Sequence, residues 1–442
     1  MEAEPPGAPS VNTRPGTSRS PRLPAAAIAV AVTANLLCGV GYVTAGRAHQ
    51  DAAAAAVVGG AAYPDRRSVE AVLTGRARAV RQRDRIAFLA TVASAPQSFR
   101  AAQERLFDNL ISLPLGDWRQ ELGAAEPLAT AKSGSTLRVV LRYRLRGFDR
   151  AEAAHTQYLT FTRRPGAGWV ITGDGAARGL RDDPQIWDAG RLTVVRGRRS
   201  LVLGTRPDTG GVAQHTRRLH AIARRLDAAV PVVTAVVGDG WARRAVALVP
   251  ADPAEAQRLV GGGQDLTRIA ALATVSQDGS GGPPGEDRIV ISPGTFDRLN
   301  ALGRDVVLTH ELTHVATGGA RDGRTPMWLI EGLADYVGYK RTHIPVRSAA
   351  RELRGEVVKG RLPAGLPGRQ DFDSASGRLA QTYEEAWLAC RMVAERYGQP
   401  ALLRLYRVAG ARPESALREV LGVDLARFTV MWRDYLRKEL AG

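Results

Sequence analysis

A chain of 442 residues is long enough for two folded domains with additional segments, and its 44% hydrophobic residues can fill their cores. The formal net charge of +17 comes almost wholly from arginine. These arginines are scattered and no nucleic-acid-binding motif accompanies them, so we expect no nucleic-acid partner. The two cysteines form no CxxC pair, which excludes a metal or redox site of that type.

The N-terminal segments predict a membrane anchor. Residues 1–24 are rich in Pro, Ser, Gly and Thr and are expected to be a disordered cytoplasmic tail. Residues 25–46 contain no charged residue and match the roughly 20 apolar residues that cross a bilayer. Arginines precede this segment, so the positive-inside rule places the N-terminus in the cytoplasm and the rest of the chain outside. We therefore expect a single-pass protein of the cell membrane, with a cleaved signal peptide or a lipoprotein signal at Cys38 as alternatives.

Small residues in 47–65 indicate a tether, and a separate α+β module is expected over 66–180. Within this module, apolar residues three and four positions apart predict a helix from Ser68, and a second helix is expected over 97–113. Runs of alternating apolar and polar residues then predict antiparallel strands at 137–146, 157–163 and 168–172.

Helices followed by strands in this order, with a Trp169-Val-Ile segment in the last strand, resemble the NTF2-like cone-shaped fold. The resemblance implies a spacer or binding module. The module has no convergent set of His, Asp and Glu residues, and His155 is expected to be an isolated residue in a solvated loop.

The remaining residues, 190–442, are predicted to form a second domain with a mostly helical C-terminal part. Its strands are expected at 191–195, 201–204, 244–249, 269–276 and 288–292. A helix is expected over 211–228, and helices predominate from Asp305 onward. The predicted fold class is therefore α+β, with an N-terminal transmembrane helix, the NTF2-like module and this second domain.

The segment His310-Glu311-Leu-Thr-His314 carries the chemistry that decides the functional interpretation. It lies in a predicted helix that ends at Gly318 and the glycine after it. Histidines four positions apart share one helix face and can bind one metal ion, while Glu311 lies beside them as a candidate base. The alternative is a helix with two partly exposed histidines and no metal.

A second helical segment can complete the site. Thr325 is predicted to be its N-cap and Pro326 its first helical residue. Glu331 follows just over one turn later and can supply a third ligand. Asp335 shares its face and can accept a hydrogen bond from a ligating histidine, expected to be the first of the pair. Gly332 is expected to let the two helices approach closely.

The HELTH segment followed by WLIEGLADY resembles the gluzincin metallopeptidases, in particular bacterial members with a W-x-x-E-G-x-A-x-Y second helix. The resemblance covers about residues 190–440 and implies a zincin fold with a mixed sheet under the active-site helix. By matching motif positions it makes His310, His314 and Glu331 the ligands of Zn²⁺, and Glu311 the general base acting on a zinc-bound water. It also implies a peptide or protein substrate. The spacing between HELTH and Glu331 is slightly shorter than in the best-known gluzincins.

The same resemblance makes Tyr383, in the segment QTYEEAW, a candidate donor to the oxyanion. The alternative for Tyr383 is an aromatic residue of a helix face packed on the core, and His343 is a second candidate for the donor role. The strand at 269–276 is expected at the edge of its sheet, where an extended substrate can pair with it.

Two other functions stay open. One is a catalytically silent cell-wall or protein-binding module that keeps a structural metal. The other is a binder of an anionic polymer or nucleic acid that uses the positive charge. The presence of Glu311 favours an enzyme, because a purely structural metal site needs no base.

Overall fold

The computed structural model describes residues 64–123, 129–131, 134–166, 168–261, 269–275, 286–318, 323–373 and 376–442. The predicted cytoplasmic tail, the membrane anchor and nearly all of the tether lie outside these residues. Within the described ranges, no helix combines the length and the apolar character needed to cross a bilayer.

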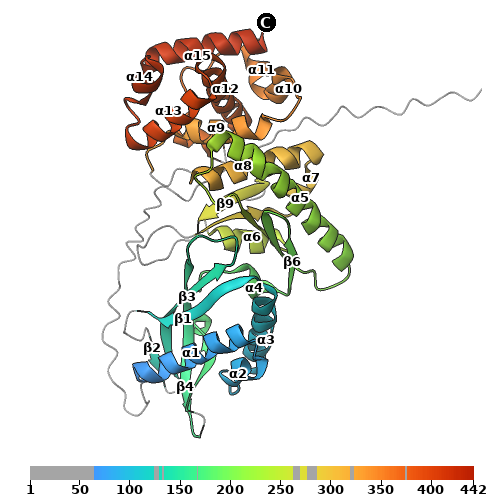
Figure 1. The fold of residues 1–442 in the computed structure, drawn as a ribbon, viewed down its shortest axis with the longest axis vertical. Helices are drawn as coiled ribbons and strands as arrows, with labels where there is room; N and C mark the ends of the chain where they lie inside the picture. The colour runs from blue at the N-terminus through green and yellow to red at the C-terminus, as the bar shows by residue number, and fades with distance from the viewer. Residues whose placement is uncertain are drawn as a thin grey trace, which may run out of the picture.

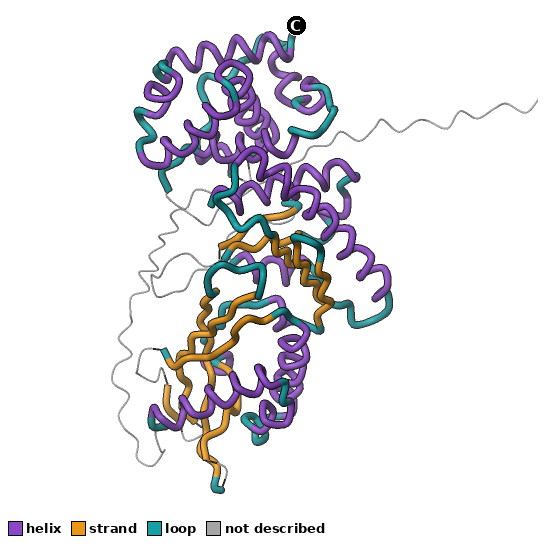
Figure 2. Tube along the Cα trace, in the orientation of Figure 1, coloured by secondary structure: helices purple, strands orange, loops and turns teal. Residues whose placement is uncertain are grey.

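The described chain is α+β and contains two β-sheets. Figures 1 and 2 show an elongated molecule with the first sheet at one end and the second sheet in the middle. The helices that follow residue 346 gather at the other end. The predicted α+β class is confirmed at this level of detail.

The first sheet and three helices form what we call the N-terminal module, residues 66–174. Neighbouring strands in it are antiparallel, in the order β1-β3-β4-β5 with β2 beside β3. Its elements are α1 (Arg66–Gln82), α2 (Arg85–Ala90), α3 (Gln97–Ser112), β1 (Leu115–Leu122), β2 (Ala129–Ala131), β3 (Gly134–Leu145), β4 (Ala153–Arg164) and β5 (Gly168–Asp174).

The sequence pattern predicts both long helices and the strands β3, β4 and β5, but it does not predict β1. This strand lacks a clear apolar alternation because charged side chains alternate with Trp118 and Gln120. One of these charged side chains, Arg119, forms an ion pair with Glu152, which directly precedes β4. The prediction of a solvated loop at His155 is wrong, because this residue lies in β4 with its ring stacked on Tyr143.

The second sheet has the strand order β6-β7-β8-β10-β9. Strands β7, β8 and β10 are parallel, and the edge strands β6 and β9 are antiparallel to their neighbours. The mixed sheet and the edge position of the strand expected within 269–276 are therefore confirmed. The strands are β6 (Leu192–Arg196), β7 (Ser200–Thr205), β8 (Ala245–Val249), β9 (Ala271–Val275) and β10 (Asp287–Ile291).

Both faces of the second sheet are covered. Successive side chains of a strand point to opposite sides, so one strand contributes to a different core on each face. Val202 of β7 packs in one core with α5 (Val212–Val237) and α8 (Ala301–Thr317). Its neighbours Leu201 and Leu203 pack in a second core with Trp187 of α4 (Ile186–Ala189) and with the N-terminal module. Helix α6 (Pro253–Val260) covers the same side near β9 and β10.

Helix α5 continues well beyond the predicted end near residue 228. It passes through Pro231 and ends at Val237, followed by Gly238. The apolar side chains of Val230, Val233 and Val236 are buried in the core along this extension. This burial explains why the helix continues although proline removes one backbone donor.

A buried ion pair joins the N-terminal module to the second sheet. Arg288 of β10 lies 2.9 Å from Asp149, and their side chains are 8% and 0% exposed. Glu286 next to β10 also accepts hydrogen bonds from the backbone N–H groups of Arg150 and Ala151. The shared core and these polar contacts fix the two parts to each other.

The C-terminal part is mostly helical, as predicted. The largest contact within it is between α9 and α12, which positions the candidate site described below. Its helices are α7 (Thr295–Arg298), α9 (Met327–Tyr339), α10 (Val346–Ala349), α11 (Arg351–Val357), α12 (Leu379–Tyr397), α13 (Gln399–Ala411), α14 (Ala416–Leu421) and α15 (Leu425–Leu440).

Candidate metal centre

Helix α8 carries both candidate histidines and Glu311. The Asn300 side chain caps its start by accepting a hydrogen bond from the Gly303 N–H at 2.8 Å. The helix ends at Gly318, whose φ of 78° is the left-handed conformation that glycine adopts without strain. This end agrees with the sequence prediction. Leu308 and Leu312 are fully buried on the core side and fix the orientation of the helix.

Helix α9 carries Glu331 and Asp335. It begins at Met327, and Pro326 is its N-cap with an extended backbone at φ −58° and ψ 136°. The prediction of Thr325 as N-cap and Pro326 as the first helical residue is therefore wrong by one position.

The prediction that Gly332 faces the helix of the two histidines is also wrong. A Cβ at Gly332 would collide with the Ala386 carbonyl of α12, whereas Gly338 is the glycine that faces α8.

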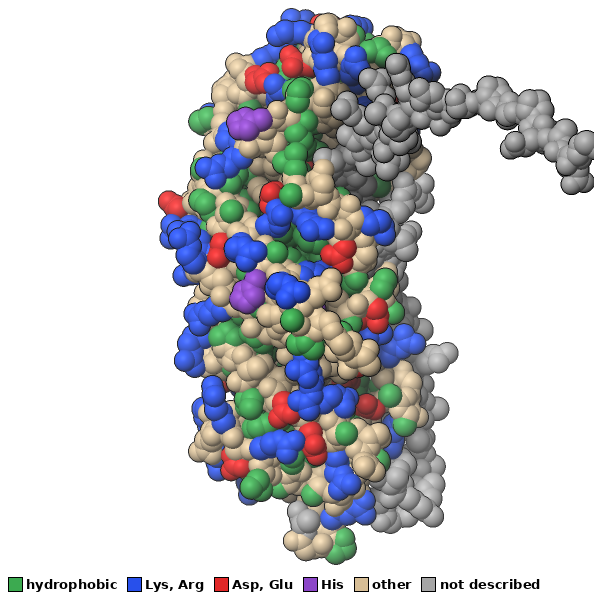
Figure 3. All heavy atoms as spheres, turned by 90° about the vertical axis from the view of Figure 1, so that its right-hand side faces the viewer, with side chains coloured by type: hydrophobic (Ala, Val, Ile, Leu, Met, Phe, Trp, Pro, Cys, Tyr) green, Lys and Arg blue, Asp and Glu red, His purple; other side chains and the backbone are tan. Residues whose placement is uncertain are grey.

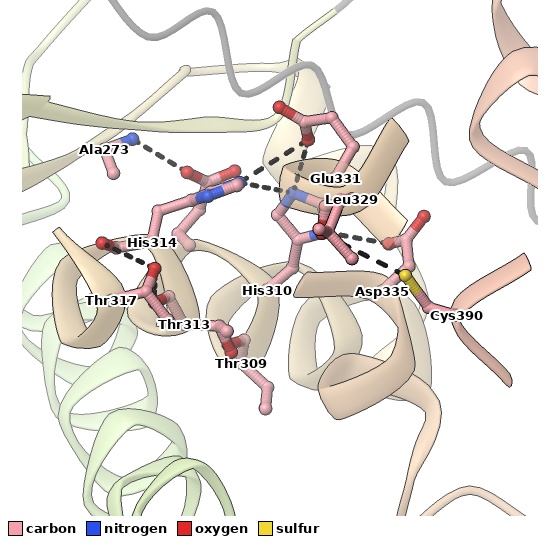
Figure 4. Close-up of polar contacts among 11 residues, drawn as sticks. Ala273, Thr309, His310, Thr313, His314, Thr317, Leu329, Glu331, Asp335 and Cys390 are labelled. Carbon is pink, nitrogen blue, oxygen red and sulfur yellow. Dashed lines mark hydrogen bonds and ion pairs between the residues drawn. The ribbon is translucent and has the colours of Figure 1, made fainter. Parts of the chain in front are cut away.

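The packing of α8 on α9 brings three candidate ligands together at one point. One ligand atom from each of His310, His314 and Glu331 lies within 4.8 Å of the other two. Oε2 of Glu331 lies 3.3 Å from Nε2 of His310 and 3.5 Å from Nε2 of His314. Figure 4 shows the three side chains pointing toward one another from the two helices. This buried group could hold a metal ion.

The donor set fits a metal such as Zn²⁺. Oε1 of Glu331 is buried without a hydrogen-bond partner among the described residues, and Oε2 contacts the two histidine Nε2 atoms at 3.3 and 3.5 Å without hydrogen-bond geometry. A buried carboxylate in this state is unfavourable unless a cation compensates it. The two histidine Nε2 atoms face each other at 2.9 Å. Two imidazole nitrogens and one carboxylate oxygen are the three protein ligands of many catalytic zinc sites.

Asp335 fixes the orientation of His310. Its Oδ1 lies 2.7 Å from Nδ1 of His310, so the contact predicted from the sequence is present. Burial would lower the pKa of His310, but the carboxylates of Asp335 and Glu331 outweigh it and raise this pKa to about 10. The same carboxylates would stabilise a metal cation in place of that proton.

Glu311 lies beside the ligands and is held by the edge strand. Its Oε2 accepts a hydrogen bond from the Ala273 N–H of β9 at 2.7 Å, while Oε1 has no hydrogen-bond partner among the described residues. Burial raises the pKa of the Glu311 carboxyl to about 8. A metal cation held by the neighbouring ligands would favour the ionised carboxylate, which is the form that can accept a proton as a general base. The sequence gives no sign of this contact, because the donor is a backbone group.

Tyr383 and His343 occupy different surroundings. Tyr383 of α12 is buried, with its ring centroid 6.3 Å from that of His310 and 5.2 Å from that of Phe372. It therefore lies next to the candidate ligands while also packing on the core. His343 is exposed in the loop after α9 and is not part of the cluster.

No protein-family model matches this chain, and no curated protein matches its sequence. The functional interpretation therefore depends on the residues and geometry of the site.

Proposed function

We propose that the protein is a zinc-dependent peptidase in which His310, His314 and Glu331 hold the metal and Glu311 is the general base. The observation that carries this proposal is the position of a further acidic side chain, Glu311, beside the three-ligand cluster. Glu311 is held by β9 rather than by the ligands, and within the described part of the chain its Oε1 has no hydrogen-bond partner. A purely structural metal site does not need such a group.

The chemistry of hydrolysis divides between metal and protein. When bound, zinc would lower the pKa of a coordinated water and polarise the scissile carbonyl. Glu311 would accept a proton on its Oε1 and later transfer it to the leaving amine. The Ala273 N–H would hold the carboxylate in place during these transfers. Tyr383 is the proposed donor to the oxyanion, supported by its position beside His310.

The proposed substrate is a peptide or protein segment in an extended conformation. Strand β9 lies at one edge of the second sheet and has β10 as its partner on one side. A peptide could pair with the other side by strand addition, directly next to Glu311. This arrangement would place a scissile bond near the base that the strand itself positions.

Metal analysis of the full chain tests the ligand assignment. We expect about one zinc per chain, and we expect His310→Ala and Glu331→Ala to lose most of it. The matched control is His343→Ala, which removes an exposed histidine outside the cluster. Full zinc occupancy in both ligand variants would overturn the assignment.

A catalytically silent binding module with a structural metal is the second candidate function. It is favoured by the burial of the ligands, because His310 and Glu331 are 0% exposed and His314 is 3% exposed. Under this alternative the full chain would bind zinc but release no new termini from any member of a peptide library.

The proposal extends to the folds of the two domains and to the position of the chain in the membrane. We propose that the N-terminal module is NTF2-like, that the second domain is zincin-like and that residues 25–46 anchor the chain with the site outside the cell. The helix and strand order supports the first two statements, and the uncharged sequence supports the third. External protease should then degrade the chain beyond residue 47 in intact cells, whereas full protection would contradict this location.

A further inference from the structure

A second hollow lies apart from the metal centre and is lined mainly by arginine. Its volume is about 500 Å³, and its lining residues are Arg198, Arg199, Ala242, Arg243 and Arg244. None of the candidate metal ligands contributes to it. The volume falls within the roughly 300–1,000 Å³ that is usual for small-molecule sites. We call these five residues the arginine pocket.

Positive charge alone does not distinguish the arginine pocket from the rest of the surface. Basic side chains are spread from end to end of the face shown in Figure 3. Most exposed arginines on a protein of this composition are ordinary surface residues. The arginine pocket differs because four arginines line one hollow and because hydrogen bonds hold the backbone that carries them.

One wall is the tight turn between β6 and β7. Asp227 of α5 accepts hydrogen bonds from the N–H groups of Arg198 and Arg199, each at 2.8 Å, and from the Ser200 hydroxyl at 2.8 Å. The carboxylate therefore holds the backbone of the turn. Gly197 fits this turn because an added Cβ would collide with Ser200 and Asp227.

The other wall is the loop before β8, whose Trp241 side chain is buried in the core. Arg243 has a φ of 52°, a left-handed conformation that is uncommon for residues other than glycine. The Arg244 guanidinium donates to the Arg198 carbonyl at 2.7 Å, and the Ala245 N–H donates to the Arg199 carbonyl at 2.9 Å. These two hydrogen bonds join the turn between β6 and β7 to the loop before β8.

The charge in the pocket is only partly compensated. Arg243 pairs with Asp239 at 2.9 Å, with both side chains at least half exposed. Among the described residues, no carboxylate lies within ion-pair distance of the Arg198, Arg199 or Arg244 guanidinium groups. The four arginines therefore outnumber the two carboxylates beside them, Asp227 on the turn backbone and Asp239 on Arg243. Like charges held together repel one another unless an anion joins them.

We propose that the arginine pocket binds a phosphate-bearing ligand. A phosphate carries about 1.5 to 2 negative charges at neutral pH and offers several acceptor oxygens, so it matches clustered guanidinium groups better than one carboxylate does. The phosphate could belong to a free phosphate compound or to a phospholipid headgroup. The proposal does not depend on the metal centre or on peptidase activity.

Isothermal titration of the purified full chain at physiological salt tests the proposal. The probes are inorganic pyrophosphate, for a free phosphate compound, and monomeric dihexanoyl phosphatidylglycerol, for a headgroup. We expect at least one probe to bind. The double substitution Arg199→Gln and Arg244→Gln should weaken that binding about tenfold or more, because it removes charge-assisted hydrogen bonds. The probe that binds identifies the source of the phosphate.

The matched control replaces Arg404 and Arg427, two exposed arginines of α13 and α15 outside the pocket, by glutamine. It removes the same net charge and should leave binding within about twofold of the original chain. Equal weakening in both double variants would show a nonspecific charge effect and overturn the proposal. Absence of binding by both probes, or a signal reproduced by NaCl at the same ionic strength, would overturn it as well.

Discussion

Nδ1 of His310 lies 2.7 Å from Oδ1 of Asp335, and both side chains are buried. Because an ionised carboxylate can only accept a hydrogen bond, the histidine proton is placed on Nδ1. When a metal cation replaces the proton on Nε2, this atom presents its lone pair on the side of His314 and Glu331. The contact between α8 and α9 thus determines which imidazole nitrogen is available to a metal.

Asp335→Asn tests this relationship. The amide keeps the size of the side chain but removes the charge that stabilises the Nδ1 proton. We expect zinc affinity to fall by roughly 10- to 100-fold with the fold retained, measured by competition with a chelator and by circular dichroism. Asp434→Asn is the control, because Asp434 forms an exposed pair with Arg437 away from the metal centre. Equal zinc affinity in all three proteins would contradict the role assigned to Asp335.

Gly332→Ala tests the close approach of α9 to α12. The added Cβ would collide with the Ala386 carbonyl and lie 2.7 Å from the Cys390 sulfur. We expect a loss of about 1–3 kcal/mol in the free energy of unfolding, measured with urea. Gly355→Ala is a matched control in α11, because an added Cβ there meets no atom within 4 Å. It should be neutral or stabilise the protein by up to about 1 kcal/mol, and an equal loss in both variants would refute the packing argument.

Arg288→Gln tests the junction between the N-terminal module and the second sheet. The substitution leaves the buried Asp149 carboxylate without its partner. Breaking such a pair typically costs about 3–5 kcal/mol, so the urea midpoint should fall strongly. Arg437→Gln breaks an exposed pair and should change stability by less than about 1 kcal/mol. Similar midpoints for the two variants would mean that the junction contributes little.

His155 makes stability depend on pH. Burial, together with the positive charge of Arg288, lowers the pKa of His155 to about 4, whereas an unfolded chain has a histidine pKa of about 6.5. The unfolded state therefore binds more protons between these values. The stabilising contribution is complete above about pH 6.5 and is lost as pH falls toward about 4.

Urea unfolding at about pH 7.5 and about pH 5 measures this effect. The original chain should lose on the order of 1 kcal/mol more than His155→Gln does over that interval. Other groups also titrate there, so the difference between the two proteins is the informative quantity. The same pH dependence in both would show that His155 does not contribute.

The sequence predicts the parts of the site that depend on local periodicity. Four positions separate His310 from His314, so any regular helix places them on one face. The helical pattern around Glu331 and Asp335 likewise puts both carboxylates on one side of α9. The predicted contact between Asp335 and His310 followed from these two patterns and is present.

Features that depend on tertiary contacts could not be predicted from the sequence. Ala273 donates its backbone N–H to Glu311, so the residue type at position 273 does not indicate this contact. Gly332 faces α12 rather than α8, because that choice depends on how three helices pack. Asp149 and Arg288 are 139 positions apart and meet only when the two sheets are in place.

Glu311→Gln is the most direct test of the central claim. The amide retains the size of the side chain and its oxygen can still accept the Ala273 N–H, but it cannot take up a proton. We predict that the variant binds zinc like the original chain and that its cleavage of a peptide library falls by about 100-fold or more. Unchanged cleavage by the zinc-loaded variant would contradict the role of Glu311 as the base, and with it the proposed peptidase mechanism.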